Sequence, residues 1–247
     1  MPPQQKPERH LAMLIDGDNA QHKLIKEMLE EVSRYGTVTT RRAYGDWVQP
    51  NMANWRDAML AHAIQPIQQW RYTNSKNATD SALIIDAMDI LYSGSVQGFC
   101  IVSSDSDYTR LCMRIRESGF FVMGMGRKQT PEAFINACDV FVHVENLSKP
   151  TKNPQPAKTP IQSKPKPNAK LLELFRRAFD IAESDNGWVH LGMLGQALHR
   201  LDPSFDSRTH GYKNLSLLVK SMPSYINVRG AKKTEPSAIY VSMKEDV

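Results

Sequence analysis

Two short apolar runs in the sequence each end in a cluster of aspartates. Asp16 and Asp18 follow the run HLAMLI, and Asp105 and Asp107 follow the run GFCIVSS. A further aspartate, Asp80, follows the polar stretch NSKNAT. Carboxylates that share a site repel one another unless a cation neutralises them, and sites with only oxygen ligands suit Mg²⁺ or Mn²⁺. Such ions polarise a phosphodiester, generate hydroxide and stabilise the leaving oxygen, so the pattern indicates hydrolysis of phosphate esters.

The elements around these acids alternate between strand and helix. Apolar and β-branched runs predict strands at 10–15, 37–44, 64–70, 98–103 and 120–125. Amphipathic or apolar stretches predict helices at 24–32, 51–63, 80–92 and 108–118, with Thr79 as the N-cap of the third, and a final helix and strand within 131–144. This alternation predicts an α/β fold of three layers (αβα) around a parallel sheet. The carboxyl ends of its strands, and the acids that follow them, should lie at one edge.

The individual acids differ in how strongly their positions indicate chemistry. Asp107 has a second interpretation, because it could cap the helix that starts near residue 108. Asp18, Asn19 and Ser104 are interpreted either as supporting groups around the acids or as turn residues. Asp86 lies six residues after Asp80, about 240° round a helix, and should point away from the site. Asp139, before the last predicted strand, has both a functional and an ordinary interpretation.

The motifs also resemble a known family when they are taken in order. The strand followed by DGDN, then KNATD, IVSSDSDYTRL and ACDVFVHVENL are similar to the NYN family, the LabA-like branch of the PIN-like nucleases, over about residues 9–147. This resemblance implies a metal-dependent nuclease that acts on RNA. It also implies that Asp16, Asp80 and Asp105 bind the metal, with support from Asp107 and Asn19. Lys76, in the loop before Asp80, is either a phosphate contact or a solvated side chain.

Two other motif interpretations fit less well. The DGD sequence resembles the DxD motif of haloacid-dehalogenase-like phosphatases, in which the first aspartate is a nucleophile. That family expects Thr or Val after DxDx, whereas Asn19 and Ala20 follow here, and no lysine precedes SDSD at the end of a strand. The run VMGMGRK has a glycine pair, Gly124 and Gly126, but lacks the third glycine of a dinucleotide-binding loop, so a turn is expected.

A stretch with the composition of a linker separates two predicted domains. Residues 148–168 contain six prolines, five lysines, no acid and no aromatic residue, so they cannot form a hydrophobic core. We therefore expect domains at 1–147 and 169–247, joined by a flexible segment. Residues 1–147 carry 15 lysines and arginines against 17 acids, and residues 148–247 carry 16 against 9. A basic second half would attract a polyanion, although a solvated linker explains much of the excess.

The second predicted domain has the pattern of a small winged helix. Helices are expected near 170–184, 191–201 and 213–221, and strands at 225–229 and 239–243. The strings GWV, PSFDSRTHGYKNLSLLV and YINVR resemble the LOTUS domain, also called OST-HTH, which implies binding of RNA or of a protein partner. The candidate phosphate contacts are Arg208, Lys213, Lys220, Arg229, Lys232 and Lys233. His210 and Tyr212 are candidates for base stacking, and a core position is the alternative for Tyr212.

Other sequence features narrow the function classes. No apolar run is long enough to span a membrane, and residues 1–10 do not form a signal peptide. Three cysteines without CxxC spacing indicate neither a zinc site nor a disulfide framework, and a cytoplasmic location is expected. The sequence thus predicts a ribonuclease that uses Mg²⁺ or Mn²⁺ and has a C-terminal RNA-recognition domain. The alternatives are a non-catalytic RNA-binding adaptor and an aspartate-dependent phosphatase.

Overall fold

The computed structural model describes residues 9–70, 78–147, 169–182, 186–230 and 238–244 of the 247-residue chain. The chain divides into two compact units, Met1–Pro150 and Thr151–Val247. The expected segment 148–168 falls outside the described residues. Within the described residues, no helix is both long enough and apolar enough to cross a lipid bilayer.

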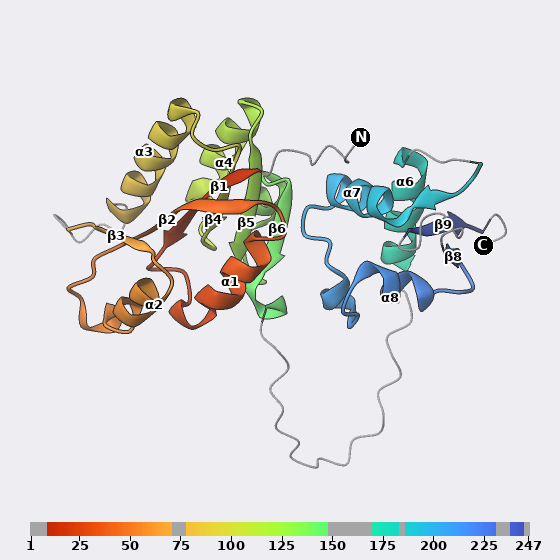
Figure 1. Cartoon of the computed structure of the whole chain (residues 1–247), viewed down its shortest axis with the longest axis horizontal. Coiled ribbons are helices and arrows are strands. Elements are labelled where there is room, and N and C mark those ends of the chain that lie inside the picture. The colour runs from red at the N-terminus through yellow and green to blue at the C-terminus, as the bar shows by residue number, and fades with distance from the viewer. Residues whose placement is uncertain (1–8, 71–77, 148–168, 183–185, 231–237, 245–247) are drawn as a thin grey trace, which may run out of the picture. The chain divides into compact units, whose positions relative to one another are not determined.

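The first unit is built around a six-stranded parallel sheet (Figure 1). Its strands are β1 (His10–Asp16), β2 (Thr37–Gly45), β3 (Gln65–Gln68), β4 (Gly98–Val102), β5 (Phe121–Gly126) and β6 (Val140–His143). Its helices are α1 (Ile25–Val32), α2 (Trp55–Ala61), α3 (Ala78–Ser93), α4 (Thr109–Glu117) and α5 (Glu132–Asn136). Short 3₁₀ turns are η1 (His22–Leu24), η2 (Pro50–Met52), η3 (Ser106–Tyr108) and η4 (Val144–Asn146). The predicted three-layer α/β fold is confirmed.

Both faces of the sheet are buried, which is why its central strands are apolar without interruption. In β1, Leu11, Met13 and Ile15 pack into one core with α1 and α2. Ala12 and Leu14 point to the opposite face and pack into a second core with α3, α4 and α5. Figure 1 shows these two groups of helices on opposite sides of the sheet. The sheet is therefore the rigid middle layer that positions the residues at its edge.

The strand order is β3-β2-β1-β4-β5-β6, so the direction of the chain through the sheet reverses between β1 and β4. Ligands of open α/β sheets bind in the crevice outside the carboxyl ends of the strands at such a reversal. β1 and β4 pair in register up to Ile15 and Val102. Asp16 follows Ile15 directly, and Asp105 follows Val102 after two serines.

Some predicted boundaries differ from those of the structure. The helix expected at 51–63 is shorter, because η2 occupies Pro50–Met52 and α2 begins at Trp55. Thr79 is not an N-cap: it lies inside α3 and is buried.

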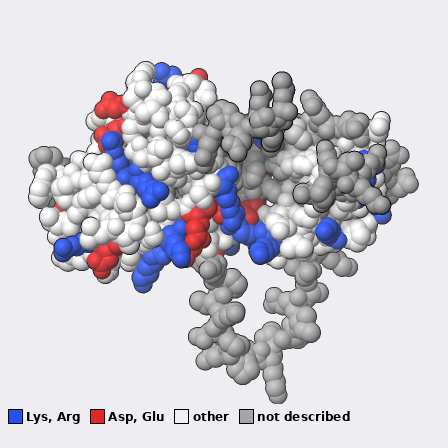
Figure 2. Space-filling view, viewed as in Figure 1, with Lys and Arg blue, Asp and Glu red and all other residues white. Residues whose placement is uncertain are grey.

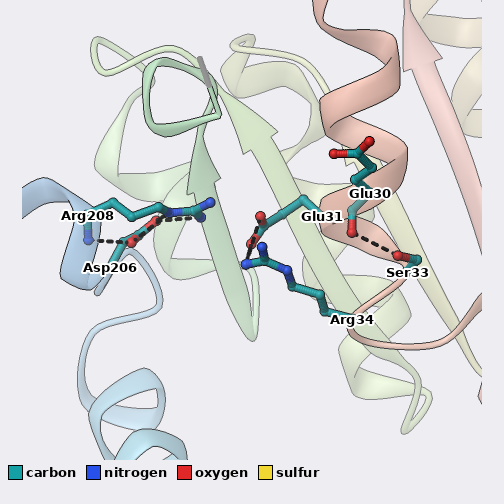
Figure 3. Close-up of polar contacts among 6 residues, drawn as sticks. All are labelled: Glu30, Glu31, Ser33, Arg34, Asp206 and Arg208. Atoms are coloured by element: carbon teal, nitrogen blue, oxygen red, sulfur yellow. Dashed lines mark hydrogen bonds and ion pairs between the residues drawn. The ribbon is translucent and has the colours of Figure 1, made fainter. Parts of the chain in front are cut away.

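At the end of α1, the Ser33 hydroxyl donates to the Glu30 carbonyl, and Arg34 pairs with the buried Glu31 at 3.1 Å (Figure 3).

The turn predicted at Gly124 and Gly126 is wrong, because both glycines lie within β5. A Cβ at Gly124 would lie 2.5 Å from the ring of Phe141. A Cβ at Gly126 would lie 2.5 Å from the carbonyl oxygen of Ser103. The glycines are therefore explained by close packing inside the sheet. The turn was predicted from the spacing of the glycines alone, which does not reveal these neighbours.

The second unit is a small winged helix, as predicted. Its elements are α6 (Ala169–Ile181), β7 (Val189–His190), α7 (Leu191–Leu201), η5 (Ser207–His210), α8 (Leu215–Lys220), β8 (Ile226–Gly230) and β9 (Ile239–Met243). The three strands form an antiparallel sheet in the order β7-β9-β8. Phe175, Leu194, Leu198 and Val219 lie in a core of its own between the helices and this sheet.

Candidate active site

Three of the predicted acids come together at the carboxyl edge of the sheet. Carboxylate oxygens of Asp80, Asp105 and Asp107 lie within 4.8 Å of one another. Asp80 comes from the first turn of α3, while Asp105 and Asp107 come from the loop and 3₁₀ turn after β4. Asp107 is exposed, and the other two are half-buried. Within the described residues, this is the only group of histidines, cysteines or acids that could hold a metal ion in this way.

Asp105 and Asp107 are placed by one local motif. Asp105 is the N-cap of η3, and its Oδ1 accepts the backbone N–H of Asp107 at 3.0 Å. The Ser103 hydroxyl also accepts the N–H of Asp105 at 3.1 Å. The capping role that the sequence offered for Asp107 therefore belongs to Asp105. The same turn thus places the carboxylates of both Asp105 and Asp107 at the acidic cluster.

Asp80 is oriented by a tyrosine that is distant in the sequence. The hydroxyl of Tyr108, which is fully buried, donates to Asp80 Oδ1 at 2.7 Å. Burial raises the pKa of Asp80, and the negative charges of Asp105, Asp107 and Asp18 raise it further, while the Tyr108 hydrogen bond lowers it. The part of this shift that comes from Asp105, Asp107 and Asp18 reflects repulsion among neighbouring carboxylates, which a bound cation would relieve.

Asp16 interacts electrostatically with Asp80 but lies deeper in the protein. Its carboxylate is completely buried and accepts the Asn19 amide and the Ser103 hydroxyl, each at 2.7 Å on Oδ2. Burial raises the pKa of Asp16, the two hydrogen bonds lower it, and the charges of Asp80 and Asp18 raise it. Asp16 does not belong to the group of three whose oxygens meet within 4.8 Å.

Asp18 connects the DGDN turn to helix α3. Its Oδ2 accepts the hydroxyl of Thr79 at 3.1 Å, and its backbone N–H donates to Asp16 Oδ1 at 3.1 Å. Gly17 precedes it at a close approach, since a Cβ there would lie 2.7 Å from the ring of Trp47. Asp18 therefore joins the end of β1 to the start of α3.

A hollow lies beside the acids, along the ends of β1, β4 and β5. Its polar lining comes from Asn19, Gln21, Ser103, Ser104 and Arg127. Ser104 accepts the backbone N–H of Arg127 at 2.9 Å, so the loop after β5 is fixed next to the loop after β4. Arg127 is exposed and thus supplies a cation beside the hollow.

The family model described as the NYN domain matches residues 10–145, which is more than half of the chain. The chain belongs to the NYN family. A second family model, the OST-HTH/LOTUS domain, matches residues 162–237. The order of the two resemblances seen in the sequence is therefore confirmed. The NYN domain belongs to the PIN-like nuclease superfamily, and the LOTUS domain is associated with RNA.

Two solved structures are similar to the chain. One is the crystal structure of a protein of unknown function from Vibrio parahaemolyticus, with 18% identity and a TM-score of 0.49, covering 57% of this chain and 95% of that one. The other is the solution NMR structure of an uncharacterized protein from Nitrosomonas europaea, with 28% identity and a TM-score of 0.31, covering 40% of this chain and 94% of that one. No curated protein matches the chain.

Two other acids of the NYN domain have structural partners instead. The Asp86 carboxylate accepts hydrogen bonds from the Arg42 guanidinium and from the Tyr44 hydroxyl, both at 2.9 Å. Asp86 lies on α3, outside the acidic cluster. Asp139 accepts the backbone N–H of Val122 at 2.8 Å and pairs with Arg116 at 3.1 Å. The ordinary interpretation of Asp139 therefore holds, and Asp86 lies away from the site, as expected.

The predicted RNA contacts fall into three groups. Lys76, Lys232 and Lys233 lie outside the described residues. Lys213 and Lys220 are exposed in the LOTUS domain, whereas the Arg208 guanidinium pairs with Asp206 at 2.7 Å (Figure 3). Tyr212 is buried in the core of that domain, so its core interpretation is correct.

Four residues that surround the acids were not predicted from the sequence to belong to the site. They are Thr79, Ser103, Tyr108 and Arg127. Ser103 directly precedes the predicted Ser104. Only the strand register decides which of the two serines donates a hydrogen bond to Asp16. Arg127 follows β5, so its position after a predicted strand was an available signal. Nothing in the sequence links Tyr108 to Asp80, which is 28 residues away.

Proposed function

We propose that the NYN domain is a divalent-metal-dependent ribonuclease, and that the LOTUS domain helps it to bind RNA. The observation that carries this proposal is the convergence of Asp80, Asp105 and Asp107 within 4.8 Å at the switch point of the sheet. Membership of a nuclease superfamily supports the reaction class, and the LOTUS match supports RNA as the substrate.

The donor set fits Mg²⁺ or Mn²⁺, because all three groups are carboxylates and no cysteine or histidine is among them. Asp80, Asp105 and Asp107 would hold the ion. When bound, it would supply Lewis acidity toward the phosphodiester and lower the pKa of water. Asp16 stays in the proposal as the fourth acid, because its buried charge lies near Asp80 and strengthens the attraction for a cation.

The remaining residues keep the site in one arrangement before substrate arrives. Tyr108 orients Asp80, the η3 cap orients Asp105, and Ser103 with Asn19 orients Asp16. Such preorganisation avoids reorganisation during the reaction. Arg127, beside the hollow, would bind a substrate phosphate next to the scissile one.

The distribution of charge agrees with a catalytic role for the NYN domain and an RNA-binding role for the LOTUS domain. Figure 2 shows lysine and arginine side chains mixed with acidic ones on the visible face of the first unit, rather than a field of one sign. A mixed surface gives weak non-specific attraction for a polyanion. RNA affinity would then depend on Arg127 and on the second domain more than on the overall charge of the NYN domain.

The decisive experiment is cleavage of single-stranded and structured RNA by the full chain, with Mn²⁺, Mg²⁺ or EDTA. Asp105→Asn keeps the η3 cap, because asparagine also caps helices, but removes one charge of the cluster. We expect cleavage only with metal, and a loss of about 100-fold or more in this variant. Asp89→Asn is the matched control, since Asp89 is exposed on α3 and outside the cluster.

Cleavage that persists in EDTA, or in Asp105→Asn, would rule out the proposal. RNA binding without any metal-dependent cleavage would instead support the adaptor alternative. Arg127→Ala tests the substrate contact: we expect a higher KM with kcat nearly unchanged, whereas the exposed Arg56→Ala should change neither. An equal effect of both arginine variants would mean that Arg127 acts only through overall charge.

A further inference from the structure

The three-stranded sheet of the LOTUS domain has one face in the core and one face outside it. Val189, Val241 and Val228 form a row across β7, β9 and β8, and this row packs into the core of the domain. Successive residues of a strand point to opposite faces. The adjacent row, which consists of His190, Tyr240 and Arg229, therefore lies on the outer face.

Aromatic rings and a guanidinium gather on this outer face. The Arg229 guanidinium carbon lies 4.3 Å from the ring centre of Trp188 and 5.4 Å from that of Tyr240. The rings of His190 and Tyr240 meet edge to face, with centres 5.6 Å apart. His190 and Arg229 are exposed, and Trp188 and Tyr240 are half-buried. We call these four residues the aromatic face.

Polar groups continue the same surface. Asn227 and Ser242 pair across β8 and β9, two residues from Arg229 and Tyr240 and so on the same side, and the Asn227 amide donates to the Ser242 hydroxyl at 3.3 Å. Residues 169–247 carry 11 lysines and arginines against 9 acids, so the positive charge on this surface comes from Arg229 rather than from an excess over the whole domain. No carboxylate pairs with Arg229 among the described residues. Rings, a cation and hydrogen-bonding groups thus lie together on the outer face of one sheet.

This chemistry matches unpaired nucleotides better than a protein segment. Bases stack on aromatic rings and on guanidinium planes, and their edges accept and donate hydrogen bonds. The positive charge of Arg229 would attract a phosphate of the same strand. An apolar protein segment would need aliphatic side chains, and the aliphatic row of this sheet faces the core.

We propose that the aromatic face binds single-stranded RNA by stacking one or two bases on Trp188, Tyr240 and the Arg229 guanidinium. This inference rests on the proposed function, because it takes RNA as the substrate, and it specifies that the RNA is unpaired. In a duplex the base faces are stacked on one another, so the aromatic face has nothing to stack on.

The test measures binding of the full chain, in EDTA and with Asp105→Asn as the parent, so that the RNA stays intact. The probes are a short fluorescein-labelled RNA without self-complementarity and the same RNA annealed to its complement. We expect the single strand to bind more tightly than the duplex, and Tyr240→Ala to weaken single-strand binding by about tenfold. Tyr240→Phe should bind like the parent, because it keeps the ring.

Arg229→Gln separates charge from stacking. It should weaken binding and also lower the slope of log affinity against log salt, by about 0.7 for one phosphate contact on a single strand, because the substitution removes the positive charge together with the stacking plane. Tyr240→Ala should weaken binding without changing that slope. Arg200→Gln is the matched control, because Arg200 is exposed at the far end of α7 from His190 and its loss should leave the preference for single strands unchanged. RNA should also quench tryptophan emission less in Trp188→Phe.

Equal affinity for single strand and duplex would overturn this inference, as would a folded Tyr240→Ala variant that binds RNA like the parent. Loss of a protein partner in that variant, with RNA affinity unchanged, would also overturn it and identify the face as a protein-binding surface. A different outcome tests the proposed nuclease function. If the wild-type chain cleaves no RNA with metal but Tyr240→Ala still loses single-strand binding, the nuclease proposal fails and the aromatic face stands.

Discussion

Each carboxylate at the edge of the sheet is held by a different contact. Asp105 caps η3, Asp80 accepts the Tyr108 hydroxyl, and Asp107 lies exposed on the 3₁₀ turn that Asp105 caps. Asp16 is buried and accepts two side-chain donors and one backbone N–H. An asparagine at position 16 would leave at least one of these donors poorly paired, at a cost of about 1–3 kcal/mol. A loss of activity in an Asp16 variant would therefore have two causes, the missing carboxylate and the reduced stability, and activity alone does not distinguish them.

Asp80→Asn separates these effects, because its amide oxygen can still accept the Tyr108 hydroxyl while the repulsion with Asp105 and Asp107 disappears. We expect an equal or higher melting temperature in EDTA. We also expect loss of the stabilisation by Mn²⁺, which in the wild type should reach about 2.7 kcal/mol at 100 times Kd. Calorimetry of the variant, the wild type and Asp89→Asn measures both effects. Equal Mn²⁺ shifts in wild type and variant would contradict the proposed site.

Gly126→Ala tests the packing that brings β5 against the site. Its Cβ would lie 2.5 Å from the Ser103 carbonyl oxygen and 2.6 Å from the Thr130 hydroxyl. We expect a loss of about 1–3 kcal/mol in unfolding free energy. Gly230→Ala is the control, because no atom of the described residues lies within 4 Å of the position that its added methyl group would occupy, so its stability should change little. Denaturant titration compares the two, and equal stability of both variants would refute the close packing.

At the scale of elements, helix α7 carries a histidine whose environment opposes protonation. Burial lowers the pKa of His199 below 6.5, while the Pro203 backbone and the charges of Asp206 and Asp202 act in the opposite direction. The His199 ring also packs edge to face on Phe205, with ring centres 6.2 Å apart. A histidine with a lowered pKa in the folded state binds protons more readily after unfolding.

The stability of the second unit should therefore fall as the pH decreases below about 6.5, since the unfolded state then takes up more protons. His210, whose pKa is also lowered by burial, contributes with the same sign. Hydrogen exchange of the α7 amides in the full chain, followed between neutral and mildly acidic pH, measures the effect. His199→Gln should show a shallower pH dependence. An identical dependence in that variant would assign the effect to other groups.

At the scale of the whole molecule, the chain joins a unit with an acidic site to a unit with an aromatic, basic surface. Residues 148–168, which hold five lysines and six prolines, connect them in the sequence. We propose that the second unit raises the local concentration of RNA near the acids without taking part in the chemistry.

Cutting the chain within 148–168 tests this arrangement. The first fragment should still cleave RNA, with RNA affinity lower by about tenfold or more and a shallower salt dependence, because the aromatic face and the basic residues are lost. Affinity for labelled RNA at several salt concentrations, measured for the fragment and for the full chain, gives both quantities. If affinities and salt slopes are the same, the second unit does not bind RNA, and a protein partner becomes its better-supported role.

Much of this organisation follows from the sequence alone, because it depends on local patterns. Apolar runs mark the strands, and the alternation of strand and helix implies a parallel sheet. Acids that directly follow two such strands must lie at its carboxyl edge, whatever the details of packing. The convergence of Asp105 and Asp107 at this edge was predictable for this reason. Asp80 was predicted from its position at a helix start after a polar loop and from the family resemblance, and the winged helix from its own order of helices and strands.

Other features depend on contacts between distant segments and only the tertiary structure decided them. The strand register selects Ser103 rather than Ser104 as the partner of Asp16. The packing of α3 against η3 brings Tyr108 to Asp80, and the neighbour of Gly126 is the carbonyl of Ser103, just after β4. A rotation or shift by one residue would change each contact while leaving every local pattern intact, so local patterns cannot determine them.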